Sequence, residues 1–131
     1  SRKRGGSVPT KICLDSDILL DFLKGHKPTV AKIKHYVDSE ELSITPLTFF
    51  ELISTVKKKG KVLRILDNLT LLPFDKKAAM RAHKVHESLF AQKVEIGMRE
   101  LINSAICIEN EAYLCTKDRS AYDGVVGLKF I

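Results

Sequence analysis

The fold class of this 131-residue chain is indicated most clearly by the stretch Lys11-Ile-Cys-Leu-Asp-Ser-Asp-Ile-Leu-Leu-Asp-Phe-Leu-Lys-Gly25. Residues 11–14 predict a short buried strand, and Asp15 follows it directly. Residues 17–24 then carry apolar side chains at helical spacing, and Gly25 is a typical residue at which such a helix ends. A strand that passes straight into a helix is the usual opening of a parallel α/β unit.

The rest of the chain repeats this alternation of strands and helices. Further strands are predicted over residues 42–45, 69–72, 112–115 and 128–131. Further helices are predicted over residues 28–38, 48–59, 62–67, 76–91 and 98–110, with Asp75 as the N-cap of the fourth. This order predicts an α/β domain with a mainly parallel sheet covered by helices on both faces. We expect one domain over residues 11–131, preceded by a basic tail or vector-derived remnant over residues 1–10.

Composition excludes several classes of protein. Hydrophobic residues make up 44% and charged residues 29% of the chain, which argues against disorder, a fibrous repeat or a membrane protein. No apolar run approaches the roughly 20 residues that span a bilayer, and the first ten residues lack the apolar segment of a secretory signal. Cys13, Cys107 and Cys115 lie in apolar runs, which predicts buried, reduced thiols and a cytoplasmic protein. The net charge of +6 suits a polyanionic partner.

Acidic residues stand close to several predicted strand ends. Asp15 follows the first strand, Glu51 lies in the predicted first turn after the second, and Asp118 comes three residues after the strand 112–115; Glu100 opens the helix before that strand. In an open parallel sheet these positions reach one edge, where ligands bind. Carboxylates this close repel one another unless something positive lies among them. Hard oxygen ligands suit one or two Mg²⁺ or Mn²⁺ ions, which activate water for attack on a phosphodiester.

Each acid also has a purely structural interpretation. The segment Thr48-Phe-Phe-Glu51 has the form of a capping box, which on its own is the favoured interpretation of Glu51. Asp15 is a possible helix N-cap, a role that Asp17 could share. Glu100 suits the positive end of a helix dipole, and Asp118 suits a turn. Their joint placement at one sheet edge favours the metal site.

Four segments in sequence order carry a family resemblance. They are Cys13-Leu-Asp-Ser-Asp-Ile-Leu-Leu-Asp-Phe-Leu-Lys-Gly25, Ile44-Thr-Pro-Leu-Thr-Phe-Phe-Glu-Leu52, Ile96-Gly-Met-Arg-Glu-Leu-Ile-Asn-Ser-Ala105 and Ala112-Tyr-Leu-Cys-Thr-Lys-Asp118. Together they resemble the four motifs of the PIN-domain family, and most closely those of VapC-type toxins of toxin–antitoxin pairs. The ending Val126-Gly-Leu-Lys-Phe-Ile131 resembles the last strand of that family.

The resemblance implies a three-layer α/β/α nuclease that cuts single-stranded RNA with Mg²⁺ or Mn²⁺, is blocked by an antitoxin protein and forms a homodimer. It also implies that Asp15, Glu51, Glu100 and Asp118 are the catalytic and metal-binding residues. Two departures concern the acids: the third is usually Asp but here is Glu100, and Asn often stands where this chain has Asp17. In addition, Asn103 and Ser104 stand where small or apolar residues are common.

Several other side chains have candidate supporting roles. Thr116 is expected either to orient a water or a phosphate oxygen, or to end its strand with a local hydrogen bond. Asp17 either adds charge to the site or caps its helix. Two basic runs are candidate RNA contacts, with solvated helix faces as the alternative interpretation. The first run is Lys57, Lys58, Lys59, Lys61 and Arg64, and the second is Lys76, Lys77, Arg81 and Lys84.

Three alternative functions remain open. The first is an RNA-processing PIN nuclease without an antitoxin. The second is a catalytically degenerate PIN-like module that binds RNA or serves as a scaffold. The third is a phosphotransfer enzyme of the haloacid-dehalogenase type, because Leu14-Asp-Ser-Asp17 resembles the Asp-x-Asp opening of that family, with Asp15 as the nucleophile.

Overall fold

The structure is a computed structural model that describes residues 8–131, so most of the tail assigned to residues 1–10 lies outside the described residues. Its strands are β1 (Lys11–Leu14), β2 (Glu41–Ile44), β3 (Thr70–Leu71), β4 (Tyr113–Cys115) and β5 (Lys129–Phe130). Its helices are α1 (Ser16–Leu23), α2 (Lys27–Val37), α3 (Pro46–Thr55), α4 (Lys59–Leu66), α5 (Lys76–Ala91), α6 (Met98–Glu109) and a short 3₁₀ helix, η1 (Arg119–Tyr122). Within residues 8–131, no helix is both long and apolar enough to cross a membrane.

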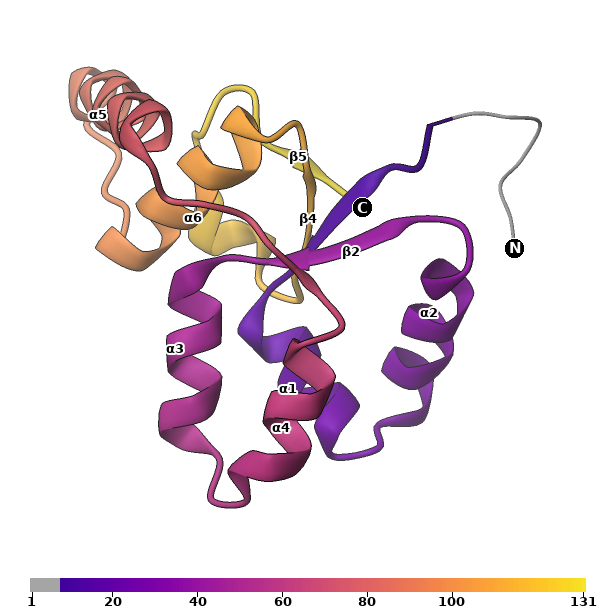
Figure 1. Cartoon of the computed structure of the whole chain (residues 1–131). Helices are drawn as coiled ribbons and strands as arrows, with labels where there is room; N and C mark the ends of the chain where they lie inside the picture. Colours follow the sequence, from indigo (N-terminus) through magenta and orange to yellow (C-terminus); the bar gives the residue numbers. More distant parts are fainter. Residues whose placement is uncertain (1–7) are drawn as a thin grey trace.

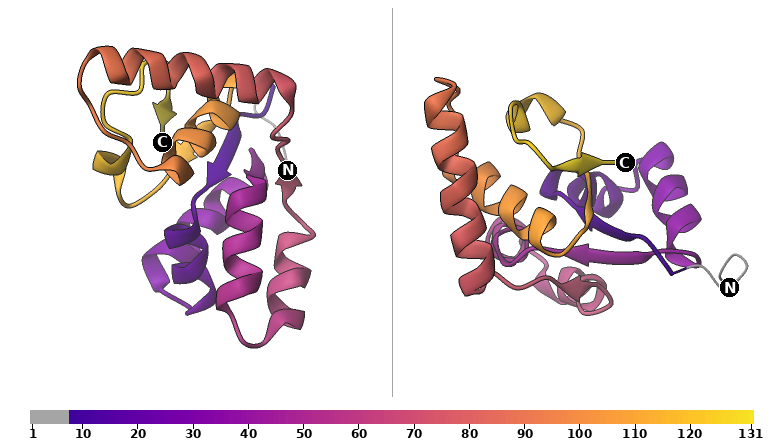
Figure 2. Two further views of the ribbon diagram at one scale, coloured as in Figure 1. Left: turned by 90° about the vertical axis from the view of Figure 1, so that its left-hand side faces the viewer. Right: turned by 90° about the horizontal axis from the view of Figure 1, so that it is seen from above.

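The five strands form one parallel sheet in the order β3-β2-β1-β4-β5, which confirms the predicted fold class. The chain moves from β1 outward to β2 and β3, then returns to the other side of β1 to form β4 and β5. Because crossovers between parallel strands are right-handed, this reversal places the two sets of helices on opposite faces. Figures 1 and 2 show α1 to α4 on one side of the sheet and α5 with α6 on the other, which gives three layers.

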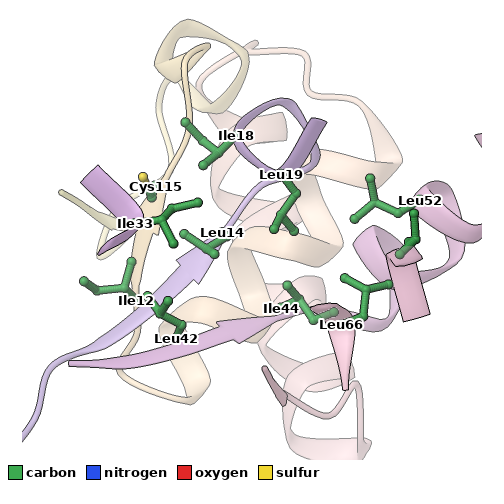
Figure 3. Packing of buried hydrophobic residues seen from close by; sticks show 11 residues of the cluster. Ile12, Leu14, Ile18, Leu19, Ile33, Leu42, Ile44, Leu52, Leu66 and Cys115 are labelled. Carbon is green, nitrogen blue, oxygen red and sulfur yellow. The ribbon is translucent and has the colours of Figure 1, made fainter. Parts of the chain in front are cut away.

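Strand β1 lies at the centre of the sheet and is buried on both faces. Ile12 and Leu14 pack into a cluster with side chains from α1 to α4 and β2, shown in Figure 3. Between them, Cys13 packs on the opposite face against residues of α5 and α6. A central parallel strand must be apolar on both faces, which explains the continuous apolar run in the sequence. All three cysteines are buried and unbonded, as predicted.

The start of α3 differs from the prediction. The helix begins at Pro46 rather than Thr48, because Thr45 is the N-cap and its hydroxyl accepts the backbone N–H of Thr48 at 3.2 Å. Glu51 therefore lies in the second turn, and the predicted capping box is wrong. The next break also differs: α3 ends at Thr55, and Gly60 lies inside α4 rather than interrupting the chain between two helices.

The N-cap of α5 offers a direct test of local stability. The Asp75 carboxylate accepts the backbone N–H of Ala78 at 3.0 Å, as the sequence predicts. We expect Asp75→Ala to lower the free energy of unfolding by about 1 kcal/mol, because it removes the acceptor for that N–H. Asp75→Asn keeps an acceptor and should stay within about 0.5 kcal/mol of the wild type. Urea unfolding measures both, and equal losses would show that the cap contributes nothing.

Candidate functional site

The candidate site lies at the carboxyl edge of the sheet, beside the point where the chain reverses between β1 and β4. Ligand sites of open α/β sheets form at such a point because the connections leaving neighbouring strands diverge there. A small cleft of about 190 Å³ opens at this place. It is lined by Asp15, Ser16, Asp17, Arg99, Glu100, Thr116, Asp118, Ala121 and Tyr122. Glu51, on α3, approaches from beside the cleft and reaches the same group of side chains through Arg99.

Arg99 lies at the centre of the acidic residues. Its Nε donates to Glu51 Oε2 at 2.6 Å, its Nη1 donates to Glu100 Oε2 at 2.9 Å, and its Nη2 donates to Asp15 Oδ1. Nη2 also donates to the Ser16 hydroxyl at 2.9 Å. Burial alone would lower the pKa of Arg99, but hydrogen bonds to Glu51 and Asp15 outweigh it and raise the pKa above its ordinary value. One permanently charged guanidinium thus joins three of the four predicted acids.

Asp15 is the most deeply placed of these acids, with only 4% of the residue exposed. Its Oδ1 also accepts the backbone N–H of Ser16 at 2.8 Å, so the N-cap interpretation holds alongside its place in the site. Its Oδ2 accepts the Tyr122 hydroxyl at 2.7 Å. Burial, together with the Asp15 charge, raises the pKa of Tyr122 well above its usual range, so this phenol stays protonated and donates. Partners on both oxygens fix the orientation of the Asp15 carboxylate.

The bond from Tyr122 to Asp15 should contribute measurably to stability. We expect Tyr122→Phe to lower the free energy of unfolding by about 1.5–3 kcal/mol, the usual contribution of a hydrogen bond to a charged group. Tyr113→Phe is the matched control, because that ring packs against the Lys129 ammonium through its face. Its loss should stay below about 0.5 kcal/mol. Urea unfolding compares the two, and similar losses would contradict a special role for the Tyr122 hydroxyl.

A buried hydrogen bond links the start of the helix that carries Glu51 to the helix that carries Arg99. The Thr45 hydroxyl, at the start of α3, donates to Asn103 Oδ1 on α6 at 2.7 Å. Both residues are buried, with about 1% of each exposed. This bond gives a reason for Asn103, one of the positions at which the sequence departs from the family pattern.

Asp118 lines the cleft without a hydrogen bond to Arg99. Its Oδ1 accepts the Ser120 hydroxyl at 2.8 Å, and its backbone N–H donates to the Thr116 hydroxyl at 3.2 Å. That hydroxyl donates in turn to Asp17 Oδ2 at 3.2 Å, which also accepts the backbone N–H of Lys117 at 2.9 Å. Asp17 therefore ties the start of α1 to the loop after β4 rather than capping the helix. Thr116 makes the local hydrogen bond expected at its strand end, to the backbone N–H of Asp118, while its bond to Asp17 joins segments far apart in the sequence.

The donor set has the right chemistry for a hard divalent cation, because it consists of carboxylate oxygens. Asp17 Oδ1 and Glu51 Oε1 are buried and have no hydrogen-bond partner among residues 8–131, so lone pairs remain free for a cation. The present arrangement is nevertheless closed around Arg99. In the described part of the chain, no three His, Cys, Asp or Glu side chains are grouped so that they could hold a metal ion together. The residues fit the ion chemically, but a guanidinium now uses the oxygens it would need.

Sequence reasoning missed Arg99 and Tyr122. Repulsion among the acids required a positive charge, and Arg99 stands directly before Glu100, so the sequence did hold a signal for it. The prediction assigned that charge to a metal alone. Tyr122 comes from η1, which no hydrophobic period indicated.

The two predicted basic runs lie away from the cleft lining. Lys57 to Arg64 surround the α3–α4 turn and the exposed side of α4. The second run lies along α5, where its side chains, Met80 and Glu109 line a shallow hollow of about 390 Å³. One member of it, Arg81, donates to Glu109 Oε2 at 2.9 Å. The structure therefore leaves both runs as exposed basic surfaces.

The protein thus has a three-layer α/β/α fold with a parallel sheet, and its carboxylates gather where the strand order reverses between β1 and β4. Residues 12–123 match the model of the PIN domain family. The chain belongs to the PIN-domain family, as its motifs predict. This membership sets aside the haloacid-dehalogenase alternative, in which Asp15 would be a nucleophile.

Solved structures of the same fold include several complexes. The chain is similar to a chain of VapBC2 from Rickettsia felis bound to a promoter DNA fragment, with 18% identity, a TM-score of 0.83, and 93% of this chain and 98% of that chain covered. It is also similar to a chain of DNA-bound VapBC from Salmonella typhimurium, with 15% identity, a TM-score of 0.81, and 93% of this chain and 97% of that chain covered. A third similar structure is FitAcB from Neisseria gonorrhoeae, with 20% identity, a TM-score of 0.78, and 92% of this chain and 96% of that chain covered. At these identities the likeness concerns the fold. No curated protein sequence matches the chain significantly.

Proposed function

We propose that this protein is a metal-dependent endoribonuclease that hydrolyses single-stranded RNA and serves as the toxin of a toxin–antitoxin pair. The observation that carries the proposal is the convergence of Asp15, Glu51 and Glu100, from three separate elements, on one cationic centre at the carboxyl edge of the sheet. Acids that repel one another gather in this way at sites built to hold positive charge.

Asp15, Glu51, Glu100 and Asp118 would hold one or two Mg²⁺ or Mn²⁺ ions. A divalent cation bound there supplies an activated water and stabilises the charge that develops on the phosphodiester. The chain's own residues position the ligands. Tyr122 and the backbone N–H of Ser16 fix Asp15, and the bond between Thr116 and Asp17 holds the loop with Asp118 beside α1.

The RNA backbone would be held by exposed positive charge. The net charge of +6 favours attraction of a polyanion at long range. The basic runs at the α3–α4 turn and along α5 are the proposed contacts. Contacts of this kind recognise phosphates rather than bases, so they set affinity more than sequence preference.

We propose an antitoxin protein as the partner that blocks the site, a homodimer as the assembly and the cytoplasm as the location. The similar structures from Rickettsia felis and Salmonella typhimurium are VapBC proteins, and VapBC is a family of toxin–antitoxin systems, which supports the first point. The three buried, unbonded thiols support a reducing compartment. A small neighbouring reading frame for a DNA-binding antitoxin would support the toxin assignment, whereas its absence would favour an RNA-processing nuclease.

A second candidate is a PIN-like module that binds RNA, or serves as a scaffold, without cutting. The observation that favours it is the engagement of three acids by Arg99, which leaves them less free to hold a metal. Titration with Mn²⁺ separates the two candidates, because a folded protein that binds RNA but no Mn²⁺ would be a scaffold.

A cleavage assay tests the proposed function. The purified protein is incubated with end-labelled single-stranded RNA in Mg²⁺, in Mn²⁺ and in EDTA, with single-stranded DNA of the same sequence as the control. We expect RNA cleavage with either ion, none in EDTA and little cleavage of DNA. Cleavage that persists in EDTA would contradict the metal dependence, and intact RNA in both metals would contradict the nuclease.

A further inference from the structure

We propose that Arg99 is a built-in counter-ion that closes the candidate metal site and competes with the divalent cation for the carboxylates of Asp15, Glu51 and Glu100. The inference rests on the proposed function in one respect, because the competing ion is the metal of that nuclease.

The geometry of Arg99 is that of a shared cation rather than of one ion pair. Each nitrogen of the guanidinium meets a different carboxylate, and the three carboxylates come from the end of β1, from α3 and from α6. Only 26% of the Arg99 side chain is exposed. A planar group with five donors can satisfy three acids at once, which a lysine ammonium does less well.

The charges around the cleft leave Arg99 outnumbered. Three carboxylates share its single positive charge, and Asp17 and Asp118 add further negative charge to the lining. Lys117 offers little relief, because its ammonium pairs with Asp21 at 2.8 Å, outside the cleft lining. A doubly charged ion would neutralise more of this excess than a guanidinium does. The site therefore remains attractive to a divalent cation while Arg99 occupies it.

Two features show how exchange can occur. Glu51 Oε1 and Asp17 Oδ1 are buried and have no hydrogen-bond partner among the described residues, so each still has an acceptor oxygen to offer a cation as Arg99 moves away. Arg99 itself lies in the first turn of α6 and lines the cleft, and its long, partly exposed side chain can swing toward solvent. The metal therefore meets a site whose competent form is only partly populated, which lowers its apparent affinity by that fraction.

Mn²⁺ binding to the full chain tests the competition. The wild type, Arg99→Gln and Arg99→Lys are stripped with EDTA, dialysed and titrated with Mn²⁺ by calorimetry. We expect Arg99→Gln to bind Mn²⁺ about tenfold more tightly than the wild type or better, because the internal competitor is gone. Arg99→Lys should fall between them. The matched control is Arg81→Gln, which removes the same charge from the pair that Arg81 of α5 makes with Glu109 at the end of α6, outside the cleft lining, and should leave Mn²⁺ affinity unchanged.

Thermal unfolding supplies a readout that does not involve activity. In EDTA we expect Arg99→Gln to melt below the wild type and below Arg81→Gln, because three carboxylates lose their shared cation. Saturating Mn²⁺ should remove most of that deficit. If Arg99→Gln does not fold in EDTA, Arg99→Lys carries the same comparison, with a smaller gain in Mn²⁺ affinity.

Equal or weaker Mn²⁺ binding by the Arg99 variants, including no binding by any of them, would overturn the inference. Cleavage of RNA by the wild type is scored separately, so the two ideas can fail independently. If the wild type cleaves RNA but removal of Arg99 brings no gain in Mn²⁺ affinity, the competition is contradicted and the proposed nuclease is not. If the wild type does not cleave RNA but removal of Arg99 clearly raises Mn²⁺ affinity, the competition is supported and the proposed nuclease is contradicted.

Discussion

Replacement of Asp15 by Asn is expected to reduce metal-dependent RNA cleavage by more than about 100-fold. Changes to groups that merely orient metal ligands already cost about 10–100-fold, and Asp15 would be a ligand itself. The fold should survive, because the single side-chain oxygen of Asn can still cap α1 at Ser16, and its NH2 group can donate to the Tyr122 oxygen, which then accepts instead of donating. Initial rates on labelled RNA in Mn²⁺ measure the activity, and circular dichroism verifies the fold.

The matched control is Asp38→Asn, which makes the same chemical change at an exposed position at the end of α2. This variant should cleave RNA at the wild-type rate. A folded Asp15→Asn variant with full activity would remove Asp15 from the metal site and with it the proposed mechanism.

Ile12→Ala is expected to be the most destabilising of the single changes considered. Ile12 is fully buried in the central strand and packs in the cluster beneath α1 to α4. Truncating such a side chain leaves a cavity and costs about 2–5 kcal/mol. A domain of this size is typically stable by only about 5–15 kcal/mol, so a large share of the stability would be lost. Urea unfolding at a single temperature gives the difference directly.

Val126→Ala is the control for Ile12→Ala, since 79% of Val126 is exposed. Its loss should remain within about 0.5 kcal/mol. Comparable losses in the free energy of unfolding at the two positions would mean that burial of Ile12 in the central strand does not stabilise the fold.

The central strand and its acid were predictable because both depend on local sequence. A doubly buried parallel strand must be apolar throughout, and the residue after it must begin the next helix, so residues 11–15 carry the whole signal. The boundaries of α3 were harder to predict. Thr45 and Thr48 are equally good caps by composition, and the choice depends on Pro46, whose fixed φ suits the first helical position.

The partners within the site were less predictable, because they lie far apart in the sequence. Asp15 and Arg99 are 84 positions apart, and their contact depends on how α6 packs beside β1. Sequence reasoning could establish that the acids need a positive charge but not which group supplies it. Tyr122 reaches Asp15 from a short 3₁₀ turn that carries no periodic pattern of its own.

Anomalous diffraction from crystals of the full chain soaked in Mn²⁺ is the most direct test of the claim that this acidic cluster is a metal site. We expect an anomalous peak in the cleft at the carboxyl edge of the sheet, in contact with Asp15 and at least one of Glu51, Glu100 and Asp118, with Arg99 moved off Asp15. A cleft without a peak at saturating Mn²⁺, with Arg99 still bound to all three acids, would contradict it.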